Sequence, residues 1–132
     1  MSAERQLPDY DDKLVINCAT WFEVEAAIHK VAIQNPNVEQ NTLENALQFV
    51  KFATERYQVP NEICLGYWPT IRIIWLYSIP PIEIEVFDIR YEYYAFEVKW
   101  TDIQEFEIMP DTFPEALKLL LDTTVSHSNE IK

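Results

Sequence analysis

Residues 70–108 read TIRIIWLYSIPPIEIEVFDIRYEYYAFEVKWTDIQEFEI. In this stretch, β-branched and aromatic residues alternate with carboxylates, most regularly where Ile82, Ile84 and Val86 flank Glu83 and Glu85. Because side chains two positions apart lie on the same face of a strand, this alternation predicts strands with one apolar face and one acidic face. The stretch therefore indicates an antiparallel sheet.

Four strands are expected in this region, connected as a meander. The first carries Ile71, Ile73, Trp75 and Tyr77 on one face and is broken by residues 78–81. The second and third form a hairpin over residues 82–86 and 91–96, with a tight turn near Asp88-Ile89. The fourth covers residues 105–108, after a turn around Thr101-Asp102.

Three helices are predicted from capping boxes, in which a Ser, Thr or Asn is followed three residues later by Glu. The three pairs are Thr20 with Glu23, Asn41 with Glu44, and Thr112 with Glu115. Apolar residues follow each pair at helical spacing, and the helices are expected to end at Asn35-Pro36-Asn37, at Val59-Pro60 and before a polar tail from Thr123.

This order of elements predicts a single α+β domain over residues 1–132, with two N-terminal helices, a four-stranded antiparallel meander and one C-terminal helix. Strands and helices do not alternate, so the helices are expected to cover one face of the sheet. Residues 1–13 are expected to form a loose arm, with residues 14–16 packing back on the domain, and residues 123–132 a polar tail.

The chain is strongly acidic, with 22 Asp and Glu residues against 10 Lys and Arg and a net charge of −12. Binding to phosphate backbones or anionic lipids needs a basic surface, so direct nucleic-acid and membrane roles are not expected. The N-terminal residues lack the pattern of a signal peptide, which favours a cytoplasmic location. In that reducing compartment, Cys18 and Cys64 are expected to be ordinary thiols.

Motifs for catalysis and cofactors are not found in the sequence. Gly66 is the only glycine, whereas loops that cradle phosphates need several. His29, His127 and the two cysteines are too dispersed for a zinc site, so neither a metal nor another cofactor is expected. We therefore expect a protein that is not an enzyme. Alternating glutamates could also converge as an acid/base pair or a cation site, but a solvated strand face explains them more simply.

The predicted sheet face opposite the helices is the candidate partner-binding surface. It would present Glu83, Glu85, Glu92, Tyr94 and Phe96. Carboxylates can steer a cationic partner and exposed aromatics can anchor it. This combination predicts a regulatory protein that neutralises or inhibits a basic protein partner, in the manner of an immunity protein, an antitoxin-like factor or a DNA mimic. The same aromatic face makes a homodimer plausible, unless the third helix or the N-terminal arm covers it.

Two other functions stay open from the sequence. One is a small enzyme or ligand-binding domain with a pocket lined by Trp68, Trp75, Tyr91, Tyr93 and Trp100. The other is a structural adaptor in a larger assembly.

The segments Trp68-Pro69-Thr70-Ile71-Arg72-Ile73-Ile74-Trp75, Ile82-Glu83-Ile84-Glu85-Val86 and Arg90-Tyr91-Glu92-Tyr93-Tyr94 resemble the strand pattern of some small uncharacterised bacterial proteins. In those proteins a helix precedes a strand that ends in Trp, and a hairpin ends in an aromatic pair. The resemblance covers about a third of the chain and implies an α+β fold. It implies no activity.

Overall fold

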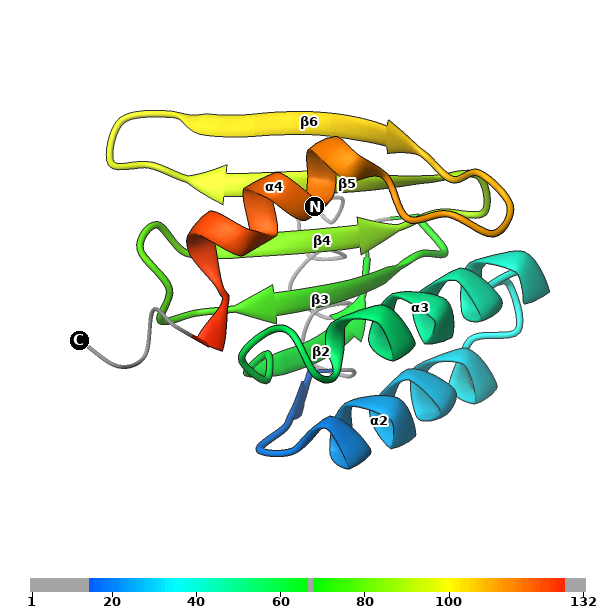
Figure 1. Cartoon of the computed structure of the whole chain (residues 1–132). Helices are drawn as coiled ribbons and strands as arrows, with labels where there is room; N and C mark the ends of the chain where they lie inside the picture. Colours follow the sequence, from blue (N-terminus) through cyan, green and yellow to red (C-terminus); the bar gives the residue numbers. More distant parts are fainter. Residues whose placement is uncertain (1–14, 67, 128–132) are drawn as a thin grey trace, which may run out of the picture.

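The computed structural model describes residues 15–66 and 68–127 (Figure 1). Within them, three helices and six strands follow one another along the chain. In order, they are β1 (Ile16–Asn17), α2 (Trp21–Gln34), α3 (Gln40–Ala53), β2 (Glu62–Leu65), β3 (Ile71–Trp75), β4 (Ile82–Val86), β5 (Arg90–Phe96), β6 (Thr101–Glu107) and α4 (Glu115–Thr124).

The six strands form one antiparallel sheet in the order β1-β2-β3-β4-β5-β6. This confirms the α+β class, but the expectation of four strands was wrong. The two additional strands, β1 and β2, pair with each other through Ile16 and Ile63. They have two and four residues, which is too short for a period of two to stand out in the sequence.

The predicted hairpin is confirmed as β4 and β5, with Ile84 opposite Tyr93. Its turn is closed by a hydrogen bond from the Phe87 amide to the Arg90 carbonyl (2.9 Å). The fourth predicted strand starts earlier than expected, since β6 begins at Thr101 and the preceding turn lies at residues 97–100. Tyr77 was also misplaced, because β3 ends at Trp75 and Tyr77 is exposed in the following loop.

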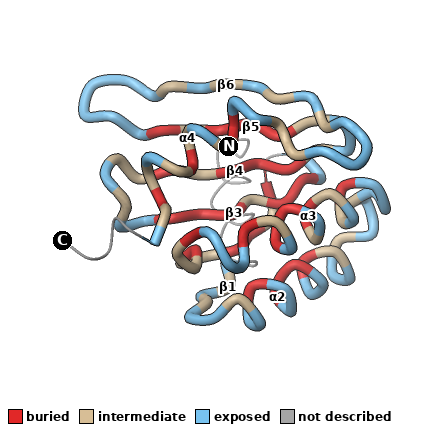
Figure 2. Tube along the Cα trace, in the orientation of Figure 1, coloured by how far each residue is buried: buried red, intermediate tan, exposed pale blue. Residues whose placement is uncertain are grey.

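The core lies between the sheet and the helices, all of which lie on the same side of the sheet (Figures 1 and 2). Phe49 on α3 is at its centre, with its ring edge-on to Trp75 at 6.3 Å and to Tyr91 at 5.7 Å between ring centroids. Alternate residues of β3, β4 and β5 point toward these rings and are buried. The apolar residues of the alternating pattern thus form the part of the core that the sheet contributes.

The first helix start is confirmed. The Thr20 hydroxyl accepts a hydrogen bond from the Glu23 amide (3.1 Å), as an N-cap residue does. The Glu23 carboxylate accepts in return from the Ala19 amide (2.7 Å), one residue before the cap itself. The helix ends at Gln34, directly before Asn35-Pro36-Asn37.

The other two predicted caps were wrong. Helix α3 begins at Gln40 after Glu39, so Asn41 lies inside its first turn and caps nothing. Helix α4 begins at Glu115 after Pro114, two residues later than a cap at Thr112 requires. Thr112 instead pairs with Met109 across a turn in which Asp111 has φ 65°. Pro110 followed by a residue of positive φ is the signature of a type II turn, and this turn delays the helix.

The chain ends differ from expectation where they are described. The arm at residues 1–13 lies outside the described residues, as do residues 128–132. A polar tail from Thr123 was wrong, because α4 continues to Thr124, Val125 is buried and Ser126 pairs with Tyr57.

We expect Thr20→Ala to lower the free energy of unfolding by about 1 kcal/mol, because it removes the cap of α2. Asn41→Ala and Thr112→Ala are matched controls in which no helix cap is lost, so each should stay within about 0.5 kcal/mol. Urea denaturation followed by circular dichroism measures all three. A loss at Asn41 or Thr112 equal to that at Thr20 would contradict the assigned helix starts.

Trp75→Ala should cost roughly 3–5 kcal/mol, since the buried ring packs on Phe49 and its Nε1 donates to the Gln58 carbonyl (2.9 Å). Trp68→Ala is the control at an exposed tryptophan and should change stability by less than about 0.5 kcal/mol. Denaturation midpoints that shift equally in the two variants would contradict this placement of the core.

Candidate functional site

The sheet face directed away from the helices is called the outer face below. On β3 to β6 it carries five carboxylates and two guanidinium groups, together with Ile74, Tyr94, Phe96, Thr101 and Ile103. The strand register places Glu85 opposite Glu92, and Glu92 opposite Glu105. All five residues predicted for partner binding lie on this face, namely Glu83, Glu85, Glu92, Tyr94 and Phe96.

Two of the predicted acids are engaged by arginines of the same sheet. Arg72 donates to both oxygens of Glu83, at 3.0 and 2.8 Å. Arg90 binds Glu92 Oε2 through Nε (2.9 Å) and Nη2 (2.8 Å). These charge-assisted contacts fix the side chains in place. Glu83 and Glu92 are thus used within the fold and do not extend freely into solvent.

Glu85 and Glu92 form a buried carboxylate pair, with exposed fractions of 4% and 8%. The Tyr94 hydroxyl lies between them, 2.6 Å from Glu92 Oε1 and 3.2 Å from Glu85 Oε1. Burial raises the pKa of this phenol above its ordinary value, and the hydrogen bond to Glu92 and the two negative charges raise it further. The hydroxyl therefore keeps its proton and bridges the pair as a donor.

The Thr70 hydroxyl lies against Glu85, with Thr70 Oγ1 2.5 Å from Glu85 Oε2. Gly66, the single glycine of the chain, lies next to this contact between Thr70 and Glu85. A Cβ atom built on Gly66 would overlap Thr70 Oγ1 and lie 2.6 Å from Glu85 Oε2. Gly66 is consequently required by the close approach of its backbone to the buried carboxylate.

The exposed part of the outer face lies along β6, at the edge of the described sheet (Figure 1). Glu105 and Glu107 are exposed there, next to the exposed side chains of Ile103 and Phe96. We call these four residues the β6 margin. From the sequence, these two acids could be members of an acid/base pair or cation site or, more simply, solvated side chains. The sequence does not assign them to partner binding, because the edge position of their strand depends on the sheet order.

The structure does not bring together the five aromatics of the alternative pocket. Trp75, Tyr91 and Tyr93 are buried in the core, whereas Trp68 and Trp100 are exposed in loops. Core packing thus accounts for Trp75, Tyr91 and Tyr93.

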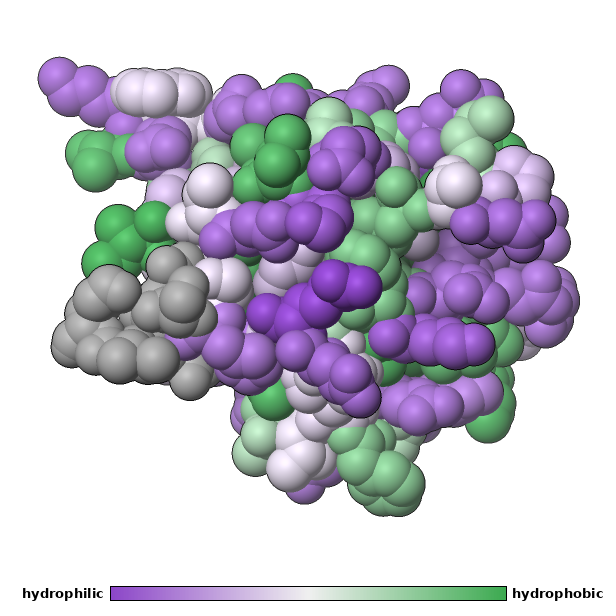
Figure 3. All heavy atoms as spheres, viewed as in Figure 1, coloured by the Kyte–Doolittle hydropathy of each residue, from purple (hydrophilic) through white to green (hydrophobic). Residues whose placement is uncertain are grey.

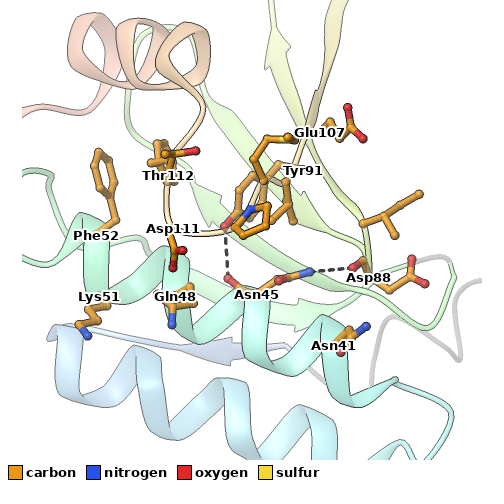
Figure 4. Close-up of a pocket in the computed structure, with 15 residues that line it drawn as sticks. Asn41, Asn45, Gln48, Lys51, Phe52, Asp88, Tyr91, Glu107, Asp111 and Thr112 are labelled. Atoms are coloured by element: carbon orange, nitrogen blue, oxygen red, sulfur yellow. Dashed lines mark hydrogen bonds between the residues drawn. The ribbon is translucent and has the colours of Figure 1, made fainter.

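A groove of about 690 Å³ does occur elsewhere, between α3 and residues 107–113 (Figure 4). Amide groups of Asn41, Asn45 and Gln48 line one side. Asn45 Nδ2 donates to the carbonyls of Phe87 and Asp88, each at 3.0 Å, and so ties α3 to the β4–β5 turn. Of the five predicted aromatics, only Tyr91 reaches this groove. Its lining comes from three separate segments, so no local sequence pattern marks it.

The described residues contain no group of three or more His, Cys, Asp and Glu side chains that could hold a metal ion. Cys18 and Cys64 are not joined in a disulfide bond. Burial, with a smaller effect of the nearby Glu23 charge, raises the pKa of Cys18 to about 11, so this thiol stays protonated. None of the described helices has the length and apolar character to cross a membrane.

Comparisons with protein-family models, with curated proteins and with solved structures gave no match to this chain.

We expect Gly66→Ala to destabilise the fold by roughly 1–3 kcal/mol, because the added methyl group displaces Thr70 or Glu85. In a Thr70→Ala background the nearest obstacle is absent, so the same substitution should cost less, and the two changes should be non-additive. A double-mutant cycle of urea denaturation measures this coupling. Strict additivity would contradict the close packing of Gly66, Thr70 and Glu85.

Proposed function

We propose that this chain is a non-catalytic, acidic binding protein that docks a basic protein partner against the β6 margin. The observation that carries the proposal is the charge balance of the outer face. On β3 to β6 this face carries five carboxylates but two arginines. Both arginines bind acids of the same sheet, Glu83 and Glu92. Among the exposed acids of this face, Glu105 and Glu107 have no such partner among the described residues.

The β6 margin combines the two features that an electrostatically steered interface uses. Glu105 and Glu107 extend a negative field that accelerates encounter with a cationic partner. Ile103 and Phe96 supply apolar area that a formed complex can bury. The proposal therefore moves the steering acids from Glu83, Glu85 and Glu92, which are bound or buried within the fold, to the exposed edge.

The overall charge of −12 supports a partner of opposite sign. An immunity, antitoxin-like or inhibitor role fits a protein whose task is to cover a basic surface. Mimicry of DNA is a narrower version of this role. Glu105 and Glu107 are two positions apart on a strand, hence about 6.6 Å, which is close to two nucleotide steps along one DNA strand, about 6.8 Å.

The double variant Glu105→Gln/Glu107→Gln tests the position of the steering acids. Proteins captured by the tagged wild-type chain from its source cells are identified by mass spectrometry, and the main binder is purified. We expect a basic protein whose association with the double variant is slower by roughly threefold or more at low salt. The dissociation rate should change less. Stopped-flow kinetics at two salt concentrations measure both.

The control is Glu25→Gln/Glu55→Gln, which removes the same charge from two exposed positions outside the sheet. At an ionic strength of about 0.1 M it should slow association less than the β6 double variant does, since surface charges beyond the Debye length of about 10 Å at that ionic strength are largely screened. Equal slowing in both double variants would reduce the effect to net charge and contradict a role of the β6 margin. A binder that is not basic would contradict the proposed class of partner.

A further inference from the structure

Two loops come together at one end of the sheet. They are residues 76–81 between β3 and β4, and residues 97–100 between β5 and β6 (Figure 1). The Phe96 amide donates to the Pro81 carbonyl (2.9 Å), which ties the base of one loop to the other. We call this surface the loop end.

The loop end exposes large apolar side chains to an unusual degree. The exposed fractions are 81% for Tyr77, 92% for Ile79, 99% for Val98 and 62% for Trp100. In Figure 3, two separate groups of hydrophobic atoms lie at the left edge of the molecule, where Figure 1 shows these two loops, with hydrophilic and intermediate atoms between them. An exposed group of this kind on an otherwise acidic protein is typical of a contact surface.

The charge of the loop end differs from that of the rest of the chain. The two loops contain one acid, Glu97, and one base, Lys99, so their charges cancel in a protein of net charge −12. Two copies of such a protein repel each other wherever their acidic surfaces meet. The loop end is a place where they can approach without that repulsion.

We propose that the loop end is the contact of a homodimer, with a second copy of this chain as its occupant. In a two-fold interface each residue contacts its complement twice, once in each direction. Glu97 of one copy can then face Lys99 of the other, and the reciprocal pair forms on the opposite side of the axis. The apolar side chains of the two loops lie around these ion pairs, and those of one copy bury those of the other. The pattern is self-complementary in both charge and hydrophobicity.

This surface is separate from the β6 margin acids. β6 begins at Thr101, next to the loop end, and runs away from it. At about 3.3 Å per residue, Glu105 lies roughly 13 Å and Glu107 roughly 20 Å along the strand from Thr101. The dimer proposal therefore stands or fails independently of the proposed partner at these acids.

Sedimentation equilibrium of the full chain, from low to high micromolar concentration at physiological ionic strength, tests the proposal. We expect a reversible monomer–dimer equilibrium. Ile79→Glu and Val98→Glu should each raise the dissociation constant at least about tenfold, because each substitution places a charge twice in a two-fold interface. Both side chains are almost fully exposed, so folding should be unaffected, as circular dichroism can verify.

Phe22→Glu and Ile33→Glu are the matched controls, since they add the same charge at exposed apolar positions on α2. They should leave the dissociation constant within about twofold of the wild type. Lys99→Glu should weaken the dimer, and the exchange Glu97→Lys/Lys99→Glu should restore it at unchanged net charge. An exchange variant that is no tighter than Lys99→Glu alone would overturn the pairing of Glu97 with Lys99.

A wild-type chain that stays monomeric over the whole concentration range would overturn the homodimer. A dimer that tolerates Ile79→Glu and Val98→Glu but is disrupted by the α2 controls would also overturn it, and would place the contact on α2. A monomer that sediments with phosphatidylcholine vesicles would overturn the proposal in favour of a lipid contact at the loop end.

Discussion

The arrangement of β4 is the constraint on which the outer face depends. Ile82, Ile84 and Val86 must enter the core, so Glu83 and Glu85 are forced onto the opposite face. The register then sets Glu85 directly across from Glu92, which would be repulsive without further groups. Arg90, Tyr94 and Thr70 supply the donors that stabilise the pair, and Gly66 leaves space for it. Much of the outer face is thus explained by the need to bury two acids side by side.

The burial of these two acids changes how the alternating glutamates of the sequence are interpreted. A glutamate in every second position is typical of a solvated strand, yet on β4 and β5 these side chains are bound by arginine, tyrosine and threonine. Truncating one member would leave a buried group without its partner, which costs more than removing an exposed charge. Substitutions at Glu85 and Glu92 therefore change the stability of the fold, and their effect on binding cannot be read separately. Only acids such as Glu105 and Glu107, exposed at the sheet edge, can report on binding alone.

Features set by local periodicity could be predicted from the sequence. The alternation in β3 to β5, the turn at Asp88 and the cap at Thr20 follow from residues close together in the chain, and the α+β class follows from them. Features set by distant residues could not. The cap pattern at Thr112 was overridden by the Pro110-Asp111 turn, and β2 is a strand because β1 and β3 flank it. Glu83 is bound by Arg72 because the register of β3 and β4 brings the two side chains together. Arg90 and Glu92, in contrast, lie two residues apart on one strand, so their proximity is already contained in the alternation of the sequence.

Glu105 and Glu107 are separated along β6 from the exposed apolar side chains of the loop end, and this separation has a consequence for assembly. The acids that face solvent on the outer face lie toward one end of β6, while the exposed apolar loops lie at the other. If two copies meet at the neutral loop end, each keeps its own Glu105 and Glu107 away from the contact. Such a dimer would present two equivalent acidic margins at a fixed separation. A basic partner that is itself dimeric could then engage both, and the second contact would form at a high effective concentration. Self-association would in this way strengthen partner binding without any contact between the dimer interface and the steering acids Glu105 and Glu107.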